Sequence, residues 1–272
     1  MRRNLEVLVS ALGKDPVQLA SDMNLECDAV IVNQGDKDLC YDFETGNAYR
    51  IRVIESTERG VGRSRNLALE NADSKIVLFS DDDIVYSKGY EDRVLEAFNS
   101  DPGADIIMFN VDVCEERRTY NITKKMNVHK WSVGRYPAFA AAARLGSIRK
   151  SGVRFSRLFG GGAKYSSGED NLFFMDCIKA GMVIKAVPVA IGAEKPRKST
   201  WFNGYNEKFF FDRGVLFSFL YGRYAVLWAL RFALAKRNLY GKSVKPSVAF
   251  RTMKAGIREG NKLKDNPERS DR

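Results

Sequence analysis

The sequence contains one histidine, His129, and only four cysteines in 272 residues. A single histidine excludes zinc sites built from several histidines and argues against a Ser–His–Asp triad. We expect His129 to be an ordinary structural or surface residue. The cysteines show no paired spacing of the zinc or redox kind, so we expect reduced thiols in a cytoplasmic protein.

Two glycine signatures are also missing, and we expect no signal peptide. The turn at 59–66, Arg-Gly-Val-Gly-Arg-Ser-Arg-Asn, fits neither the Walker loop nor the dinucleotide fingerprint, which argues against an ATPase or a dehydrogenase. The first apolar run ends at Gly13, which is too short for a typical signal peptide. The net charge of +10 favours an anionic partner, but no recognisable nucleic-acid module occurs, so we expect no nucleic acid.

Apolar, β-branched segments alternate with helical patterns in the first half of the chain. We expect strands at 5–12, 28–33, 49–54, 75–80, 104–113 and 183–191, and helices at 17–23, 64–72, 90–98 and from 168, with Ser64 as an N-cap. This order predicts an α/β fold with a mostly parallel sheet, in which ligands bind at the carboxyl ends of the strands.

Three carboxylates, Asp81, Asp82 and Asp83, follow the most apolar of these strands. Adjacent like charges at a strand end are costly to bury unless a cation holds them. A divalent ion that binds a nucleotide diphosphate would provide that charge. A solvated acidic turn is the other interpretation, and the triplet alone favours it.

Two further segments carry candidate chemistry. The glycine-containing turn with Arg63 and Arg65 leads into a helix, whose amino end favours phosphate; a basic surface turn is the alternative. Glu169 and Asp170 follow a glycine loop at the start of another helix. A carboxylate there is suited to act as a general base, although acidic residues also commonly cap helices.

In this order and spacing, the aspartate triplet, the arginine turn and the segment 159–170 (Phe-Gly-Gly-Gly-Ala-Lys-Tyr-Ser-Ser-Gly-Glu-Asp) resemble family-2 inverting glycosyltransferases. The strings Val-Ile-Val-Asn-Gln at 30–34 and Ser-Thr-Trp-Phe-Asn-Gly-Tyr at 199–205 are similar to bacterial capsule, exopolysaccharide and O-antigen members. The resemblance covers about residues 5 to 215 and implies the A-type, Rossmann-like nucleotide-sugar-binding fold.

The resemblance also implies roles for individual residues. In the DXD motif, Asp83 would bind Mn²⁺ or Mg²⁺ together with Asp81, which would also contact the sugar or ribose, and Asp82 would support them. Asp170 would be the acceptor base, with Glu169 as its acidic neighbour. The remaining donor-binding candidates are Ser10, Gln34, Asp36, Glu55, Arg63 and Arg65.

The sequence departs from the family at several of these places. Ser10-Ala11-Leu12 stands where relatives often have a Pro-Thr turn, and Asn33-Gln34 stands where they often have two aspartates, so a UDP-sugar is only a first expectation. Glu194 lies in the region where many relatives carry a histidine ligand. A sugar-phosphate nucleotidylyltransferase and a non-enzymatic basic adaptor for membranes or nucleic acid remain the alternatives.

We divide the chain into a catalytic domain at 1–212, a helical appendage at 213–255 and a charged, mobile tail at 256–272. Residues 1–113 would form the nucleotide-sugar-binding half of the catalytic domain, and 114–212 the half that binds a glycan or lipid-linked glycan acceptor. We expect 214–235 to form one amphipathic helix with Arg213, Arg223 and Arg231 on one side. Such a helix would either lie on the acidic inner face of the plasma membrane or pack on the catalytic domain.

Overall fold

The computed structural model describes residues 4–114, 118–195, 204–241 and 243–265. Its strands are β1 (Leu5–Leu12), β2 (Asp28–Gln34), β3 (Leu39–Glu44), β4 (Arg50–Ser56), β5 (Ile76–Asp81), β6 (Ile84–Tyr86), β7 (Ile106–Asp112), β8 (Met126–Asn127), β9 (Ala141–Arg144) and β10 (Ile184–Glu194). Its helices are α1 (Pro16–Asp22), α2 (Val61–Asn71), α3 (Tyr90–Ser100), α4 (Leu145–Ser151), α5 (Glu169–Lys179), α6 (Glu207–Tyr221), α7 (Ala225–Ala235), α8 (Arg237–Tyr240) and α9 (Pro246–Asp265).

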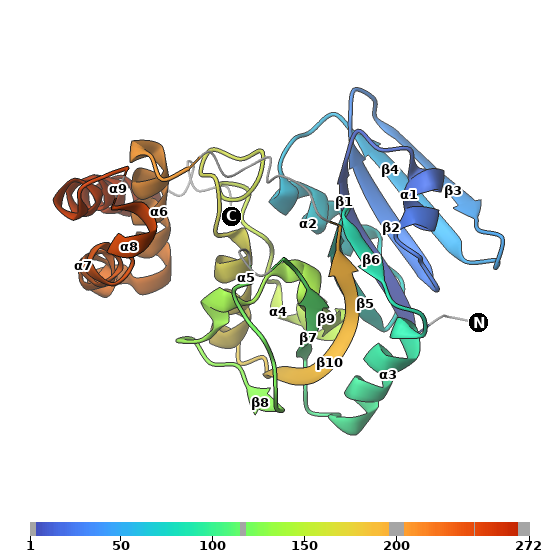
Figure 1. Ribbon diagram of the computed structural model, residues 1–272. Helices are drawn as coiled ribbons and strands as arrows, with labels where there is room; N and C mark the ends of the chain where they lie inside the picture. The colour runs from blue at the N-terminus through green and yellow to red at the C-terminus, as the bar shows by residue number, and fades with distance from the viewer. Residues whose placement is uncertain (1–3, 115–117, 196–203, 242, 266–272) are drawn as a thin grey trace.

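All ten strands belong to one mixed sheet, in the order β3-β4-β2-β1-β5-β9-β7-β10-β6, with β8 paired to β10. The strands β4, β2, β1, β5, β7 and β10 point the same way, and the other four run against them. Helices flank the sheet, and α6 to α9 form a separate cluster on the far side of α5 (Figure 1). The predicted fold, a mostly parallel sheet flanked by helices with a C-terminal helical appendage, is confirmed.

Several elements differ from the sequence-based expectation. The strand β3 was missed; it pairs antiparallel with β4 at the sheet edge, and its side chains are exposed on both faces except for the partly buried Phe43. The strand β9 is rich in alanine, which favours helix, yet it lies buried between β5 and β7, where small side chains fit. Ser64 is not the N-cap of α2, which begins at Val61 after Gly60 with a φ of 125°.

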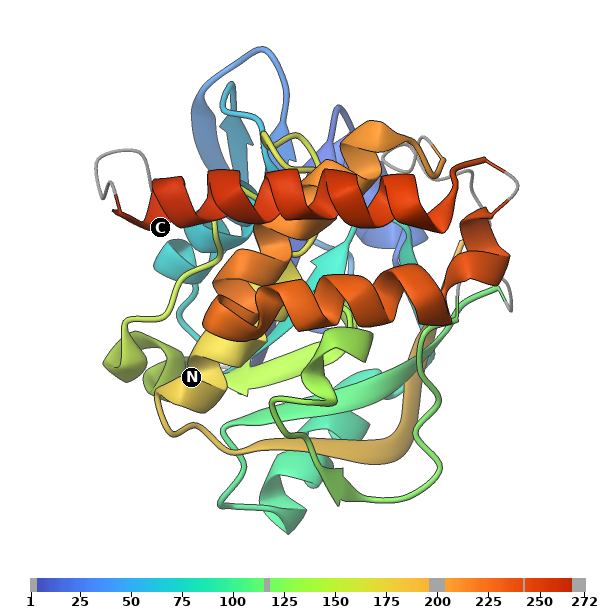
Figure 2. The same ribbon diagram turned by 90° about the vertical axis from the view of Figure 1, so that its left-hand side faces the viewer.

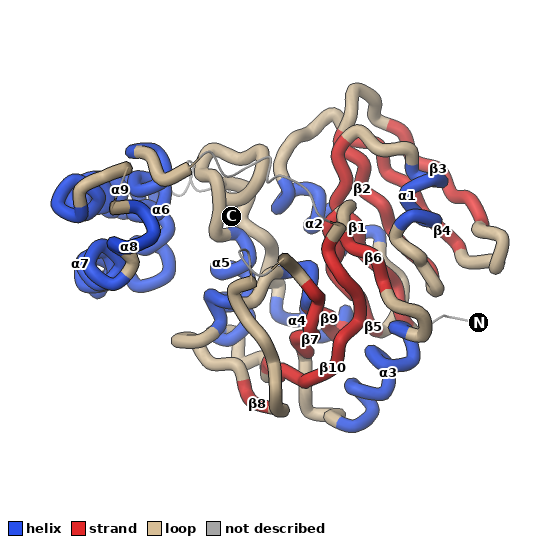
Figure 3. Tube along the Cα trace, in the orientation of Figure 1, coloured by secondary structure: helices blue, strands red, loops and turns tan. Residues whose placement is uncertain are grey.

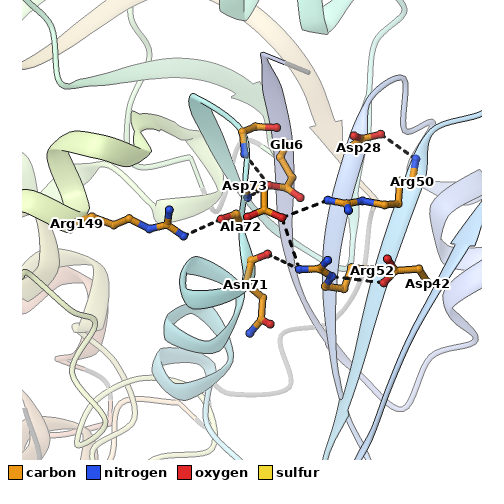
Figure 4. A network of polar contacts seen from close by, with 10 residues as sticks. Glu6, Asp28, Asp42, Arg50, Arg52, Asn71, Ala72, Asp73 and Arg149 are labelled. Carbon is orange, nitrogen blue, oxygen red and sulfur yellow. Dashed lines mark hydrogen bonds and ion pairs between the residues drawn. The ribbon is translucent and has the colours of Figure 1, made fainter. Parts of the chain in front are cut away.

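A polar network fixes the connection between α2 and β5 at the amino edge of the sheet (Figure 4). The buried Glu6 carboxylate accepts hydrogen bonds from the amides of Asp73 at 2.7 Å and Ser74 at 3.3 Å. Arg52 donates to the carbonyl of Asn71, and Arg149 donates to that of Ala72. The network therefore anchors the carboxyl end of the helix that carries Arg65.

Helices α6 and α9 cross in close contact beside α7 (Figure 2). A Cβ atom at Gly214 would lie 2.1 Å from the Met253 carbonyl oxygen, and one at Gly256 would lie 2.1 Å from that of Phe211. Glycine at these two positions therefore allows the helix backbones to approach more closely than larger side chains permit. Because Gly256 and Leu263 are buried in this packing, the expectation of a mobile tail is wrong over 256–265.

The expected single helix over 214–235 is wrong as well. A 3₁₀ turn at Gly222–Tyr224 separates α6 from α7, which run in different directions (Figures 2 and 3). The guanidinium of Arg213 lies over the rings of Phe209 and Phe232 rather than on a basic face shared with α7. By length and composition alone, 207–235 could span a membrane. An apolar stretch of 18 residues within it has a mean hydropathy of 1.2 and is 33% buried. The turn interrupts that stretch.

Candidate active site

The parallel strands bring distant polar residues to one edge of the sheet. Strands β4, β2, β1 and β5 are neighbours and end at Ser56, Gln34, Leu12 and Asp81. In the register of β1 and β5, Ser10 lies opposite Asp81. The aspartate triplet therefore begins at the carboxyl edge of the sheet, as the sequence predicts.

Arg65 on α2 connects this edge to the start of α5. Its Nη2 atom donates to Asp81 Oδ1 at 2.8 Å, while Nη1 donates to Asp170 Oδ1 at 2.6 Å and to Glu169 Oε1 at 3.1 Å. One planar guanidinium thus holds three carboxylates from two segments that lie about ninety residues apart in the sequence. The other oxygen of Asp170 accepts from the amide of Ala138 at 3.0 Å.

Burial governs the electrostatics of this cluster. The side chain of Arg65 is only 3% exposed and that of Glu169 is 12% exposed. Burial of Glu169, reinforced by the negative charge of Asp170, raises its pKa from 4.5 to about 7 despite Arg65. Burial opposes the charge of Arg65, but Asp170 and the other two carboxylates outweigh it and raise the arginine pKa. Arg65 is therefore a permanent cation, whereas Glu169 can change charge near neutral pH.

Aromatic packing beneath the cluster holds its supporting elements together. The rings of Phe155 and Phe173 stack at 3.8 Å, and Phe79 meets both edge-on at 5.3 and 5.7 Å. Phe79 precedes Asp81 on β5, and Phe173 follows Asp170 on α5. Arg65 lies over the Phe155 ring, with 5.4 Å between its guanidinium carbon and the ring centroid. Apolar contacts thus fix the parts of the backbone that present the charged groups.

The glycine loop before Glu169 packs directly on the arginine turn. The amide of Val61 donates to the carbonyl of Gly161, and that of Gly60 donates to Gln34 Oε1 at 2.7 Å. A Cβ atom at Gly160 would lie 2.8 Å from the Glu169 carboxylate, so this loop needs glycine there. The first amides of the turn are therefore used within the protein, and they are not available as the expected phosphate cradle.

The rest of the aspartate triplet faces two other segments. Asp82 Oδ2 accepts from the amide of Leu12 at 3.3 Å, and Asp83 is buried, with its carbonyl accepting from the amide of Lys195. Glu194, on β10, lies opposite Ile84 in the pairing with β6. The structure thus brings Glu194 to the segment that directly follows Asp83, and it leaves Asp83 outside the contacts of Arg65.

The remaining predicted donor-binding residues occupy separate places. Glu55 accepts two hydrogen bonds from the Asn33 side chain, next to Gln34 at the sheet edge. Asp36 is 98% exposed, with Arg59 3.5 Å away. Arg63 pairs with Glu58 at 3.2 Å and lines a cavity of about 480 Å³ together with Arg154 and Arg157. The structure therefore does not bring Arg63 into the cluster around Arg65.

Sequence reasoning missed the Ala138 amide that holds Asp170. It comes from an irregular loop, and a backbone amide has no signature in the sequence. His129 is exposed on the same loop, as expected for a surface histidine. Most of the Ser-Thr-Trp segment, 199–203, lies outside the described residues.

The donor set is compatible with a divalent ion that is shared with a substrate. Within the described ranges, no three Asp, Glu, His or Cys side chains gather into a metal-binding group. Mg²⁺ and Mn²⁺ that act on nucleotides commonly take one or two protein carboxylates and fill the remaining positions with phosphate oxygens and water. The aspartate triplet provides carboxylates of this kind, and Arg65 contacts only one oxygen of Asp81.

Comparisons with known proteins agree with this arrangement. The model of the family described as "Glycosyl transferase family 2" matches residues 7–158. Among solved structures, S. aureus TarS 1–349 in complex with UDP-GlcNAc aligns with a TM-score of 0.64 at 13% identity, over 97% of this chain and 92% of that chain. The mannosyltransferase PcManGT from Pyrobaculum calidifontis, in complex with GDP-Man and Mn²⁺, aligns with a TM-score of 0.52 at 14% identity, over 96% of this chain and 76% of that chain.

No curated protein matches the sequence. At these identities the two structural neighbours establish the fold alone, and both have the arrangement of sheet and helices described above. The family model spans more than half of the chain, including the aspartate triplet and Arg65. The chain belongs to glycosyltransferase family 2.

Proposed function

We propose that this glycosyltransferase moves a sugar, with inversion, from a nucleotide diphosphate donor to a hydroxyl group of a glycan acceptor in bacterial surface polysaccharide biosynthesis. The observation that supports it most is the single guanidinium of Arg65, which joins Asp81 to Glu169 and Asp170. The donor and the acceptor hydroxyl need to meet at the anomeric carbon. The Arg65 contacts fix Asp81, on the donor side, relative to Asp170, the candidate base. Family membership favours glycosyl transfer over the nucleotidylyltransferase and adaptor alternatives.

Asp83 and Asp81 would hold Mn²⁺ or Mg²⁺, with Asp82 fixed by the amide of Leu12 beside them. When bound, such an ion supplies positive charge that stabilises the departing nucleoside diphosphate. Ser10, Gln34, Asp36, Glu55 and Arg63 remain proposed donor contacts; Ser10 on β1 lies beside Asp81, and Gln34 and Glu55 lie at the ends of the next two strands. A UDP-sugar is the first donor to test, and a GDP-sugar is the second, because the structural neighbours are complexes with UDP-GlcNAc and GDP-Man.

Asp170 would accept the proton of the attacking acceptor hydroxyl. Its two oxygens are oriented by Arg65 and by the amide of Ala138, so the carboxylate is preorganised before the acceptor arrives. As the hydroxyl oxygen bonds to the anomeric carbon, the bond from that carbon to the diphosphate breaks, and its electron pair leaves with the phosphate. Attack opposite the leaving group inverts the configuration. Arg65 acts as a positioning residue for Asp170 in this scheme.

The same protein would work at the inner face of the plasma membrane. On α7, Leu227, Leu230 and Leu234 lie at helical spacing and are 63%, 41% and 51% exposed. The exposed Arg231 lies between these leucines in the sequence, and the exposed Lys236 directly follows the end of α7. Exposed leucine next to lysine and arginine fits an acidic lipid surface, where both contribute to binding.

Nucleotide release from UDP- and GDP-sugars tests the proposed activity. We expect turnover by the wild type with Mn²⁺, loss of turnover on chelation, and a strong decrease in the Asp83→Ala variant. Turnover that is independent of metal and survives Asp83→Ala would refute the metal role. Release of pyrophosphate from a nucleoside triphosphate and a sugar phosphate would instead support the nucleotidylyltransferase.

A further inference from the structure

A second cavity, of about 270 Å³, opens between the loop at 130–135, helix α5 and the C-terminal helices. Its lining includes Trp131, Arg135, Asn171, Arg213 and Trp228. None of the roles discussed above involves this cavity, although it lies at the junction of the sheet domain and the C-terminal helical cluster. Its walls combine two features, a row of aromatic rings and several positively charged side chains.

The aromatic wall is a stack of three rings. Tyr221 and Trp228 stack with centroids 4.4 Å apart, and Trp131 lies nearly parallel to Trp228 at 6.0 Å. The outermost ring, that of Trp131, is 65% exposed although tryptophan is a large apolar residue. Sugar rings have apolar C–H faces that pack on exposed aromatic faces, so the stack suits a saccharide.

The described charged side chains that line the cavity are all positive. Lys130, Arg135 and Arg213 line it, and none of the described residues in its lining is an aspartate or a glutamate. Within the part of the chain that the structure describes, none of these three cations forms an ion pair; Lys130 and Arg213 contact only aromatic rings through their charged groups. Burial lowers the pKa of Arg213, which is the signature of a cation without a nearby anion. A ligand that carries negative charge would compensate all three.

The cavity adjoins the proposed base. Asn171, the residue after Asp170, forms part of its wall. The loop that contributes Lys130 and Arg135 continues to Ala138, whose amide holds the Asp170 carboxylate at 3.0 Å. A ligand in this cavity would therefore lie beside the start of α5, which carries Asp170.

We propose that this cavity is an acceptor subsite that binds a saccharide bearing an anionic group, with the sugar on the Trp131 ring and the anion at Arg135 and Arg213. The inference rests on the proposed glycosyl transfer and specifies its acceptor class. Phosphate and carboxylate share the chemistry required, and they are compared in the test. The aromatic stack gives affinity for the sugar, and the cations select the charged acceptor over a neutral one.

Two of the three tryptophans of the chain line the cavity, so intrinsic fluorescence reports on its occupancy. The probes are glucose 1-phosphate, glucuronic acid and glucose, titrated with saturating UDP and then with GDP to keep the donor site filled. We expect the anionic probes to change the emission and to bind at least about tenfold more tightly than glucose, as expected for charge-assisted hydrogen bonds. The tighter of the two anionic probes identifies phosphate or carboxylate as the preferred group.

Trp131→Ala and Arg135→Gln change exposed side chains and should not disturb packing. We expect Arg135→Gln to weaken the anionic probes about tenfold and to leave glucose binding unchanged. Because Trp131→Ala removes one of the two reporting tryptophans, its dissociation constants are measured by isothermal titration calorimetry. Arg258→Gln, an exposed charge on α9 outside the cavity, is the matched control and should bind like the wild type.

Equal binding of glucose and the anionic probes, or unchanged binding in Arg135→Gln, would overturn the subsite. Turnover of nucleotide sugar with water as acceptor is measured in the same preparations. It should persist in Arg258→Gln, whose side chain lies outside the cavity. Turnover without selective binding refutes the subsite alone, whereas selective binding without any turnover refutes the proposed function alone.

Discussion

Replacing Arg65 by lysine keeps a positive charge but removes the planar fork that contacts three carboxylates. The guanidinium makes contacts of 2.6, 2.8 and 3.1 Å through two different nitrogens. A lysine ammonium is a single point and cannot reach both Asp81 and Asp170 in the same geometry. We therefore expect Arg65→Lys to fold but to lose the relative placement of these two groups.

The size of the effect follows from burial. Charge-assisted hydrogen bonds contribute about 1.5–3 kcal/mol each, and breaking a buried ion pair costs about 3–5 kcal/mol. We expect Arg65→Lys to lower the free energy of unfolding by about 3 kcal/mol. Misplacement of the base by about 1 Å should reduce kcat by about 100-fold. The acidic limb of the pH profile should move to higher pH, because Arg65 lowers the pKa of Glu169 and its correct placement is lost.

The assays are urea denaturation and the pH dependence of nucleotide release in wild type and Arg65→Lys. Arg154→Lys is the matched control, since Arg154 and its partner Glu70 are 48% and 52% exposed and a surface pair contributes only about 0–1 kcal/mol. We expect that control to keep both stability and the pH profile. If Arg65→Lys matched the control in both measurements, the positioning role of Arg65 would be wrong.

Three further results are expected. The folded-state pKa of Glu169 is raised from 4.5 to about 7, so the folded protein retains a proton that the unfolded chain has released. The contribution of Glu169 to stability is therefore present at low pH and is lost as pH rises from about 4.5 through about 7. Measured by urea denaturation across this window, the free energy of unfolding should depend less on pH in Glu169→Gln than in the wild type. An unchanged pH dependence in the variant would contradict this prediction. Gly256→Ala should cost about 1–3 kcal/mol by clashing with the α6 backbone, whereas Gly146→Ala in α4 meets open space and should stabilise by about 0.5–1 kcal/mol; equal effects would disprove the packing argument. Leu227→Ser with Leu234→Ser should abolish co-sedimentation with vesicles containing phosphatidylserine, and binding that persists would exclude α7 as the contact.

Much of the fold follows from local sequence patterns. The strands β1, β2, β5 and β7 bury nearly continuous apolar runs, and β4 alternates apolar with polar residues. The alternation of these strands with helices indicates a parallel sheet. The elements that were missed depend on tertiary contacts. The alanines of β9 form a strand only because β5 and β7 flank them. The polar segment 256–265 is helical because glycine at Gly256 lets α9 pack on α6.

The candidate site, like the fold, depends partly on local sequence patterns and partly on tertiary packing. The sequence places Asp81 and Asp170 at element ends, but the distance between those ends depends on the whole sheet. Arg65 was expected at the donor, and only the packed structure brings its guanidinium between the two carboxylate groups. The bend at Gly222, which separates the half-buried Arg213 from the exposed face of α7, likewise has no periodic signature. Patterns therefore identify the reacting groups, and packing determines their partners.

The anomeric configuration of the first product tests the account most directly. Proton NMR can follow the sugar released from an α-linked UDP- or GDP-sugar with water as acceptor, before mutarotation scrambles it. We expect the β-anomer to form first with wild type and Mn²⁺, and we expect Asp170→Asn to reduce its rate of formation strongly. First formation of the α-anomer, or an undiminished rate in Asp170→Asn, would contradict a single inverting displacement with Asp170 as the base.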